Sequence, residues 1–306
     1  MKKVFIDGSA GTTGLKIFDR LSLRKDVELI KIPEEFRKDP MARKDAINSS
    51  DIVFLCLPDV AAKESVSLVE NKSVKIIDTS TAHRTADGWV YGFPELNNNR
   101  EKIFKSNKIA NPGCHASGFI SLIAPLVDAK IIDKKEKLTC FSLTGYTGGG
   151  KKMIEEYESV EKPALYSAPR QYGLGQQHKH LPEMQKICNL ENMPVFCPIV
   201  APFARGMEVT VPLFSSQIKC GIEEIKEIYK EVYKGKLVHY DDVDENGFLS
   251  AGYYSERDDM GVSVYGNNDR IILVSRFDNL GKGASGAAIQ NMNILLGVDE
   301  TTGLVF

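Results

Sequence analysis

The first 80 residues alternate short apolar runs with amphipathic segments, and this alternation limits the possible folds more than any other feature of the chain. We expect strands at residues 3–6, 27–32, 51–57 and 74–78, with helices at 15–23 and 61–69. The run at 51–57 shows no polar alternation before Pro58 ends it, which is typical of a strand buried on both faces. Strands separated by helices predict a parallel, doubly wound sheet.

The pattern changes after about residue 111. Runs rich in Val and Ile predict strands at 138–143, 195–200, 207–214, 261–265 and 270–277, and residues 221–233 form an amphipathic helical pattern. Because these strands are not regularly separated by helices, we expect an α+β domain with a mixed or antiparallel sheet. The last apolar segment, 284–296, is an expected helix that docks on other parts of the protein.

The charge balance excludes several classes of function. The chain has 39 Lys and Arg against 41 Asp and Glu, so no overall positive charge attracts nucleic acid or an anionic membrane. The longest run without charge, residues 109–127, contains Asn, Pro, Gly and His, so we interpret it as a turn and a buried helix. Asp7 interrupts the N-terminal apolar stretch, which argues against a signal peptide, and we expect a cytoplasmic protein with reduced thiols.

A glycine-rich loop follows the first expected strand and precedes the first expected helix. Glycines at this junction let the backbone approach a pyrophosphate, and the helix N-terminus directs free N–H groups at the anion. The alternative is a structural turn without a ligand. The spacing is G-x-x-G-x-x-G, and the predicted cofactor-binding residues are Gly8, Ser9, Gly11, Thr12, Thr13 and Gly14.

The end of the second expected strand favours NADP over NAD. NAD sites place a carboxylate there to bind the ribose 2′-hydroxyl. Here Ile32 and Pro33 end the strand, no carboxylate sits clearly at its tip, and several cations follow closely: Arg37, Lys38, Arg43 and Lys44. A solvated loop would also explain these cations.

A second glycine loop, 145–152, resembles a P-loop but carries Lys152 where the magnesium-binding Ser or Thr would be. We therefore expect it to shape the substrate site, with Gly148 and Gly149 offering backbone N–H groups to a phosphoryl or carboxylate group. A tight turn without a ligand is the alternative.

Cys114 is the candidate nucleophile. The turn Asn111-Pro112-Gly113 places it at the start of an apolar helix, and a helix N-terminus favours the reactive thiolate. The alternative is a structural cysteine. The other five cysteines lack this setting.

Two histidines, His178 and His180, lie close to Glu183, which could orient an imidazole as acid or base for the cysteine. These residues do not make up a zinc motif, so we expect no metal. Arg205, a lone cation before a strand, suits a substrate carboxylate, and an ordinary salt bridge is the alternative.

With these residues in view, the chain resembles the N-acetyl-gamma-glutamyl-phosphate reductase family, in its shorter type 2 form. The resemblance covers essentially the whole chain, and the Asn-Pro-Gly-Cys motif is its most specific part. Aspartate-semialdehyde dehydrogenases are similar in plan, but there the nucleophile normally follows Asn directly. The other matching motifs are 7–14, Asp78-Thr79-Ser80 with His83-Arg84, 92–95, 178–183, Arg205-Gly206 and 278–283.

The resemblance implies a Rossmann-like NADP-binding domain, residues 1–113 and 281–306, with the catalytic domain, 114–280, inserted between its two parts. It assigns the nucleophile to Cys114 and the acid/base to His180. We also expect Arg205, Glu183, Gly148 and Gly149 at the substrate site, and Ser80 and Asn279 at the cofactor site.

The implied reaction is the reduction of an acyl phosphate through a Cys114 thioester, with His180 supplying a proton. A homodimer or homotetramer is expected. Three alternatives remain: a sister reductase acting on aspartyl phosphate or a carrier-bound acyl phosphate, a cofactor-free Cys–His hydrolase or acyltransferase, and an NADP-sensing protein without activity.

Overall fold

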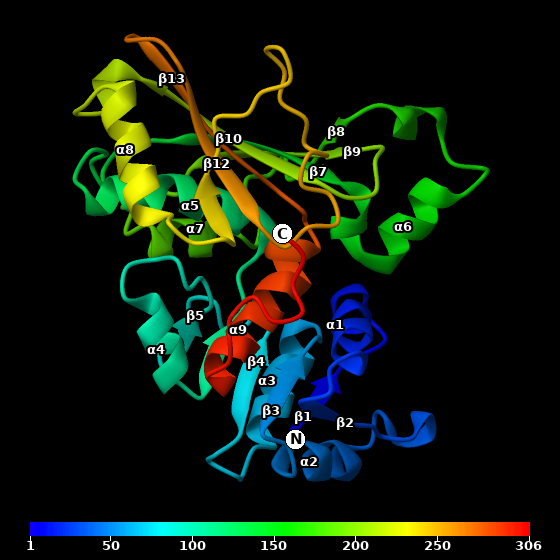
Figure 1. Ribbon diagram of the computed structural model, residues 1–306. Helices are drawn as coiled ribbons and strands as arrows, with labels where there is room; N and C mark the ends of the chain where they lie inside the picture. The colour runs from blue at the N-terminus through cyan, green and yellow to red at the C-terminus, as the bar shows by residue number, and fades with distance from the viewer. The chain divides into compact units, whose positions relative to one another are not determined.

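The computed structural model describes all 306 residues, and the chain forms two compact units (Figure 1). One contains Met1–Pro112 and Ala284–Leu304, and the other contains Gly113–Gly283 and Val305–Phe306. Each unit is built on one sheet, so the predicted division into a doubly wound part and an α+β part is confirmed.

The first unit is a parallel sheet of six strands in the order β2-β1-β3-β4-β6-β5. The strands are β1 (Lys2–Asp7), β2 (Val27–Ile30), β3 (Ile52–Leu55), β4 (Lys75–Asp78), β5 (Val90–Tyr91) and β6 (Lys108–Ala110). The helices are α1 (Thr12–Ser22), α2 (Pro40–Asn48), α3 (Asp59–Ser67), α4 (Asn99–Lys105) and α9 (Gly286–Leu296).

Strand β3 shows why this sheet needs helices on both faces. Ile52 and Phe54 join the apolar cluster that includes α1 and α9, whereas Val53 and Leu55 join the cluster that includes α2 and α3. All four side chains are at most 1% exposed, which confirms the prediction of a strand buried on both faces. Helix α9 therefore returns the end of the chain to the first sheet.

The second unit is a mixed sheet of seven strands in the order β11-β12-β13-β10-β7-β9-β8. Its strands are β7 (Thr139–Gly145), β8 (Arg170–Gln171), β9 (Val195–Ala201), β10 (Met207–Phe214), β11 (Val238–Tyr240), β12 (Met260–Gly266) and β13 (Arg270–Phe277). Its helices are α5 (Cys114–Asp128), α6 (Gly150–Glu158), α7 (Leu181–Ile187) and α8 (Ile222–Val232).

Helix α5 is the centre of the second core. It packs on β10 and β13 and contacts α7 and α8. Gly118 allows the close approach to β10, because a Cβ there would lie 2.3 Å from a methyl carbon of Val209. The predicted buried helix in residues 109–127 is confirmed, although residues 111–113 form an irregular link rather than a turn, and none of the helices combines the length and the apolar character needed to cross a bilayer.

Some element ends differ from the sequence-based expectation. The last helix was expected from residue 284, but Gly281–Ser285 forms a π-helical turn and α9 begins at Gly286. Helices α2, α4 and α7 were not expected, because they are only seven to nine residues long and carry little apolar periodicity.

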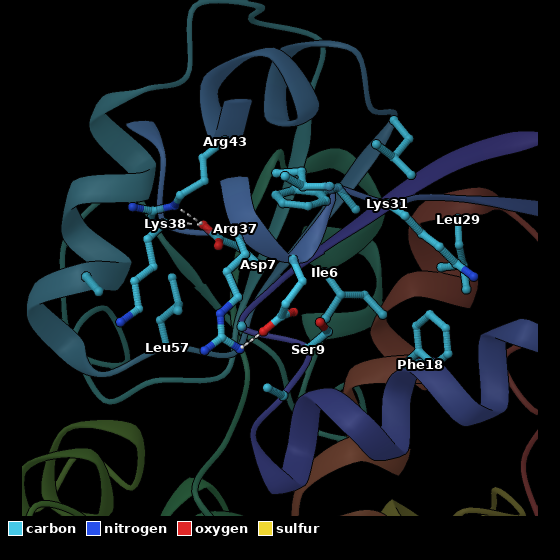
Figure 2. Close-up of a pocket in the computed structure, with 17 residues that line it drawn as sticks. Ile6, Asp7, Ser9, Phe18, Leu29, Lys31, Arg37, Lys38, Arg43 and Leu57 are labelled. Carbon is cyan, nitrogen blue, oxygen red and sulfur yellow. Dashed lines mark hydrogen bonds and ion pairs between the residues drawn. The ribbon is translucent and has the colours of Figure 1, made fainter. Parts of the chain in front are cut away.

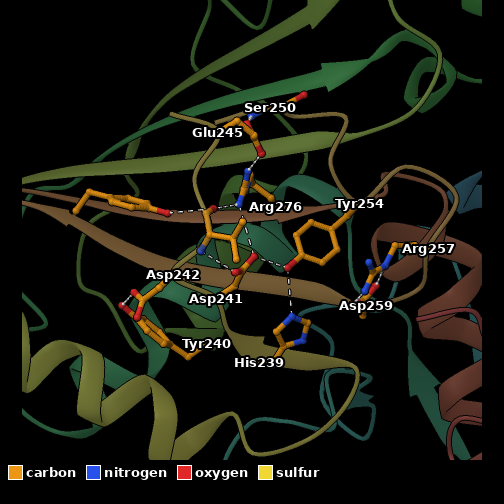
Figure 3. A network of polar contacts seen from close by, with 12 residues as sticks. His239, Tyr240, Asp241, Asp242, Glu245, Ser250, Tyr254, Arg257, Asp259 and Arg276 are labelled. Carbon is orange, nitrogen blue, oxygen red and sulfur yellow. Dashed lines mark hydrogen bonds and ion pairs between the residues drawn. The ribbon is translucent and has the colours of Figure 1, made fainter. Parts of the chain in front are cut away.

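A buried arginine joins the 241–259 segment to the sheet (Figure 3). Arg276 on β13 is 1% exposed, and it donates hydrogen bonds to the Glu245 carboxylate at 2.9 Å and the Val243 carbonyl at 2.6 Å. Asp241 lies 3.5 Å from the same guanidinium and accepts a hydrogen bond from the Tyr254 hydroxyl. The segment then continues to Ser255, whose hydroxyl donates to the Arg205 carbonyl at 2.7 Å.

Replacing Arg276 by alanine is expected to destabilise the second unit by about 3–5 kcal/mol, because it leaves the buried Asp241 carboxylate without its cation. Urea unfolding followed by circular dichroism measures this loss. The matched control is Arg270→Ala on the exposed end of the same strand, for which we expect a change within about 0.5 kcal/mol. Equal effects of the two substitutions would contradict the role of the buried network.

Candidate active site

Cys114 is the first residue of α5, as the sequence predicts. Gly113, the N-cap, is extended and no side chain caps the helix, so backbone N–H groups of the first turn face the region of the thiol. The Cys114 side chain is partly exposed. A helix N-terminus stabilises an adjacent negative charge, so this position favours a thiolate.

Glu183 connects Gly113, the residue before Cys114, to the candidate acid/base His180. One carboxylate oxygen accepts a hydrogen bond from the Gly113 N–H at 3.1 Å, and the other lies 3.9 Å from Nε2 of His180. Both side chains are buried, at 1% and 5% exposed. The structure therefore brings Cys114, His180 and Glu183 together, with Glu183 placed to orient its neighbours.

The sequence analysis assigned no role to His115, yet the structure places it beside His178 and His180. Its Nδ1 lies 2.7 Å from the Ser142 hydroxyl, and its Nε2 lies 2.7 Å from the Tyr172 hydroxyl. The rings of His178 and His180 are each 5.5 Å from its own. Burial, together with the nearby charges of His178 and Lys179, lowers the pKa of His115 to about 3.

Sequence reasoning missed Ser142 and Tyr172 for a simple reason. They lie 28 and 58 residues beyond Cys114 in the chain, and neither belongs to a recognisable motif. The polar Ser142 within an apolar strand is the one local signal that was available.

The other cysteines differ from Cys114 in their surroundings. Burial raises the pKa of the Cys56 thiol to about 12, and it also raises the pKa of Cys140, Cys188 and Cys220. These thiols stay protonated near neutral pH and are poor nucleophiles.

The second glycine loop is joined to the segment that carries Arg205. The backbone N–H groups of Gly145, Tyr146 and Thr147 donate to the carbonyls of Gly206, Phe203 and Ala204. These three N–H groups are therefore not available to bind a ligand. Gly148 and Gly149 continue the loop into α6.

Arg205 lies beside two carboxylates of the same unit. Its Nε is 2.8 Å from Asp278, and its Nη1 is 3.6 Å from Glu256, whose side chain is 80% exposed. Asp278 also accepts the backbone N–H groups of Leu280 and Gly281, so it is fully engaged in this turn. Asp278 thus orients the guanidinium through Nε, and the solvent-exposed carboxylate of Glu256 lies near Nη1.

Close packing of the backbone requires glycine at two positions of the first glycine loop. Gly8 has φ +91°, and a Cβ there would lie 2.4 Å from the Cys56 carbonyl oxygen. A Cβ on Gly14 would lie 2.4 Å from the Gly8 carbonyl oxygen. Gly11 is the N-cap of α1, and Thr12 and Thr13 begin the helix, which no side chain caps. The free N–H groups and the absence of side chains fit a dinucleotide phosphate.

Next to this loop is a cavity of about 480 Å³ in the first unit (Figure 2). Its walls are mainly apolar, with Phe18 and Leu29 on one side and Leu57 on the other (Figure 2), and Ser9 contributes from the glycine loop. The cations that line it are Lys31, Arg37, Lys38 and Arg43. An apolar cavity with cations beside a phosphate-binding loop fits an adenosine carrying a further phosphate.

Arg43 differs from the other cations of this cavity. It is buried, and its guanidinium donates to Asp7 at 3.1 Å and to the Ser65 hydroxyl at 2.6 Å (Figure 2). Arg37 pairs with Glu34 at 2.8 Å, whereas Lys38 is exposed. Lys38 and Lys31 are therefore the cations most available to an incoming phosphate.

The two remaining predicted cofactor residues, Ser80 and Asn279, form hydrogen bonds within the units to which they belong. In the first unit, the Ser80 hydroxyl donates to Asp78 at 2.8 Å. In the second unit, the Asn279 side chain accepts from the Gly206 N–H at 3.0 Å and donates to the Thr147 hydroxyl at 2.9 Å. Asn279 thus stabilises the second glycine loop and the Arg205 segment. No group of three or more His, Cys, Asp and Glu side chains is placed to hold a metal ion.

Comparisons with known proteins place this site in a family. The model of the semialdehyde dehydrogenase dimerisation domain matches residues 114–279, and that of the semialdehyde dehydrogenase NAD-binding domain matches residues 22–106. N-acetyl-gamma-glutamyl-phosphate reductase 2 of Nostoc sp. is 43% identical and covers 99% of both chains. The Brucella ovis N-acetyl-gamma-glutamyl-phosphate reductase is 44% identical over 96% of this chain and 99% of its own.

The chain belongs to the N-acetyl-gamma-glutamyl-phosphate reductase family.

Solved structures show that this family shares a fold with aspartate semialdehyde dehydrogenases. The enzyme II from Vibrio cholerae, complexed with ASA, aligns with a TM-score of 0.72 at 18% identity, over 97% of this chain and 98% of that chain. The Candida albicans enzyme with NADP aligns with a TM-score of 0.68 at 15% identity, over 97% and 99% of the chains.

The buried, neutral His115 predicts a pH-dependent stability. The unfolded chain binds a proton at this residue below pH 6.5, but the native chain does not until about pH 3, so stability falls as the pH falls. Between pH 7.5 and 5 the loss due to His115 amounts to about 2 kcal/mol. Urea unfolding at both pH values should show this loss for the parent and a smaller loss for His115→Gln. An equal loss in both proteins would contradict the assignment.

Proposed function

We propose that the protein reduces N-acetyl-gamma-glutamyl phosphate to N-acetylglutamate semialdehyde and phosphate with NADPH, a step of arginine biosynthesis. The observation that carries the proposal is the start of α5. There Cys114 lies at a helix N-terminus whose preceding N–H is bound by the Glu183 carboxylate, and Glu183 also faces His180. The family of the chain supplies the substrate class.

In the first step, the Cys114 thiolate attacks the acyl carbonyl and phosphate leaves, so a thioester forms. Backbone N–H groups at the start of α5 are placed to stabilise the oxyanion of the tetrahedral intermediate. Each such donor is worth about 3–4 kcal/mol in comparable enzymes. A thioester accepts a hydride more readily than an ester or amide does, which is why a cysteine suits this task.

His180 moves the proton of the second half-reaction. NADPH, when bound, supplies the hydride that reduces the thioester carbon. His180 gives a proton to the oxygen and takes it back when the thiohemiacetal releases the aldehyde and the Cys114 thiolate. Glu183, at 3.9 Å from Nε2, orients the ring.

We assign the anionic groups of the substrate to Arg205 and the second glycine loop. Asp278 orients the Arg205 guanidinium, and a substrate carboxylate would replace the exposed Glu256 at its outer edge. Gly148 and Gly149 follow the residues that are hydrogen bonded to the 203–206 segment, and their backbone N–H groups would contact the same anion.

The cofactor would be held by the first glycine loop and the adjoining cavity. Gly8 and Gly14 let the loop pack closely on the backbone of Cys56 and on itself, and the N-terminus of α1 would attract the charge of the pyrophosphate. Lys31 and Lys38 would attract the additional phosphate of NADP.

Replacing Cys114 by alanine should reduce activity by at least about 10³-fold, because the covalent step is lost. The assay follows phosphate-dependent reduction of NADP⁺ by N-acetylglutamate semialdehyde, with NAD⁺ and aspartate semialdehyde compared. His180→Asn should lower turnover by roughly 10²–10⁴. The control is Cys220→Ala, a partly exposed thiol outside the site.

Retained activity in Cys114→Ala would overturn the proposed nucleophile. If the protein oxidises aspartate semialdehyde in preference to N-acetylglutamate semialdehyde, its activity is that of an aspartate-semialdehyde dehydrogenase and the proposed substrate is wrong. Circular dichroism establishes that the variants are folded.

We propose further that the outer face of the second sheet joins two copies of the chain in a homodimer. The face opposite α5 carries exposed apolar side chains on neighbouring strands: Phe141, Val195, Pro212, Phe214 and Ile272. A group of exposed apolar side chains on one face of a sheet is typical of an interface between subunits. The match to a domain described as a dimerisation domain supports a second copy of the chain as the partner at this face.

The double variant Phe141→Glu with Phe214→Glu should convert the dimer to a monomer, because two like charges per chain would be buried in the interface. Light scattering coupled to size exclusion measures the mass. Phe104→Glu, which alters an exposed apolar residue on α4 of the first unit, is the control and should remain a dimer. A dimer in both variants would place the interface elsewhere.

A further inference from the structure

The turn that follows β13, residues 278–283, is held together by its first residue. Oδ1 of Asp278 accepts the N–H groups of Leu280 and Gly281 at 2.7 and 3.0 Å. The Asp278 carbonyl accepts those of Gly281 and Gly283 at 3.1 and 3.0 Å. Asp278 is completely buried, so water does not compete for these hydrogen bonds. The 278–283 turn therefore has little freedom to change its shape.

One end of the 278–283 turn lies against the proposed nucleophile. A Cβ on Gly283 would lie 3.0 Å from the Cβ of Cys114, whereas two carbon atoms pack best at about 3.5–4.0 Å. The same Cβ would lie 3.3 Å from the buried ring of Phe277. Gly283 does not have a positive φ, so glycine is needed here for space and not for backbone conformation. The turn thus limits how far the Cys114 side chain can move in this direction.

The other end of the 278–283 turn holds the segment that carries Arg205. Oδ2 of Asp278 lies 2.8 Å from Nε of Arg205, and the Asn279 side chain accepts the Gly206 N–H at 3.0 Å. The turn also packs on the preceding segment, because a Cβ on Gly281 would lie 2.0 Å from the Arg257 carbonyl oxygen. One short turn therefore contacts both the Cys114 side chain and the Arg205 guanidinium.

We infer that the 278–283 turn sets the separation between the Cys114 thiol and the Arg205 guanidinium, and that Gly283 and Asp278 are positioning residues at its two ends. The inference rests on the proposed function, since it takes Cys114 as the nucleophile and Arg205 as the group that binds the substrate carboxylate.

A fixed separation between these two groups selects substrates by length. The thiol attacks the carbonyl carbon at one end of the substrate, and the guanidinium binds the carboxylate at the other end. A substrate with one methylene fewer cannot reach both groups at once in the reactive geometry. A misplacement of about 1 Å can lower a rate by about 10²-fold, so the separation has a large effect on the reaction.

The test compares N-acetylglutamate semialdehyde with N-acetylaspartate semialdehyde, which is one methylene shorter and otherwise identical. Phosphate-dependent reduction of NADP⁺ gives kcat and KM for each, and the selectivity is the ratio of the two kcat/KM values. The parent should prefer the longer substrate by at least about tenfold. A residue that merely stabilises the fold lowers both values by the same factor, so a change in selectivity reports positioning.

Gly283→Ala adds a methyl group against the Cys114 Cβ and should displace the nucleophile relative to Arg205. We expect kcat for the longer substrate to fall by about 10–100-fold with little change in KM, and the selectivity to fall by at least about fivefold.

Asp278→Asn acts on the other end of the turn. With its oxygen at the Oδ1 position, the asparagine still accepts the N–H groups of Leu280 and Gly281, but its uncharged amide no longer pairs with Arg205. We expect KM for the longer substrate to rise by about tenfold with little change in kcat. The selectivity should again fall, because the substrate carboxylate is no longer bound at one place.

Gly235→Ala is the matched control and should leave both kinetic constants and the selectivity unchanged, because a Cβ there would meet no atom within 4 Å. Unaltered selectivity in a folded Gly283→Ala or Asp278→Asn variant would overturn the inference. Circular dichroism shows whether each variant is folded, and either variant keeps the test available if the other is not. If the parent does not oxidise N-acetylglutamate semialdehyde, the proposed function itself fails, whereas an active parent with equally selective variants contradicts the positioning role alone.

Discussion

The hydrogen bond from the Gly113 N–H to the buried Glu183 carboxylate is the interaction on which the site depends. It holds the first turn of a helix that is buried along nearly its whole length, and Gly118 lets that helix lie directly on β10. Because the helix cannot move without opening the core, Cys114 keeps one position. The same carboxylate faces His180, so one side chain orients the nucleophile and the acid/base.

Burial also determines which groups of the chain carry charge. His115, beside the nucleophile, is neutral, and outside the site the thiols of Cys56, Cys140, Cys188 and Cys220 are held in the protonated form by their surroundings. A dry environment strengthens each remaining electrostatic contact. The helix N-terminus therefore acts on Cys114 next to a buried carboxylate and a neutral buried imidazole. This explains how a chain with almost no net charge can serve an anionic substrate.

Periodicity and local motifs were enough to predict the kind of sheet in each unit, the start of α5 and the place of the first glycine loop between β1 and α1, but not the short strands β5, β6, β8 and β11. These features depend on residues close in sequence, such as the apolar run of β3 or the glycines at 8, 11 and 14. The partners of His115 were not predictable, because only the assembled sheet brings Ser142 and Tyr172 to the helix. The pairing of Arg43 with Asp7 and of Arg205 with Asp278 likewise depends on the tertiary fold. The roles of the individual site residues and the predicted domain boundaries stay predictions.

The most direct test of the account is to mix the enzyme with N-acetylglutamate semialdehyde and NADP⁺ while phosphate is omitted. The reaction should stop after one turnover, with a burst of NADPH and an N-acetylglutamyl group on the Cys114 thiol, detected by mass spectrometry after acid quenching. Adding phosphate should release the acyl group and restore steady turnover. A burst without acylation of Cys114, or steady turnover without phosphate, would contradict the account.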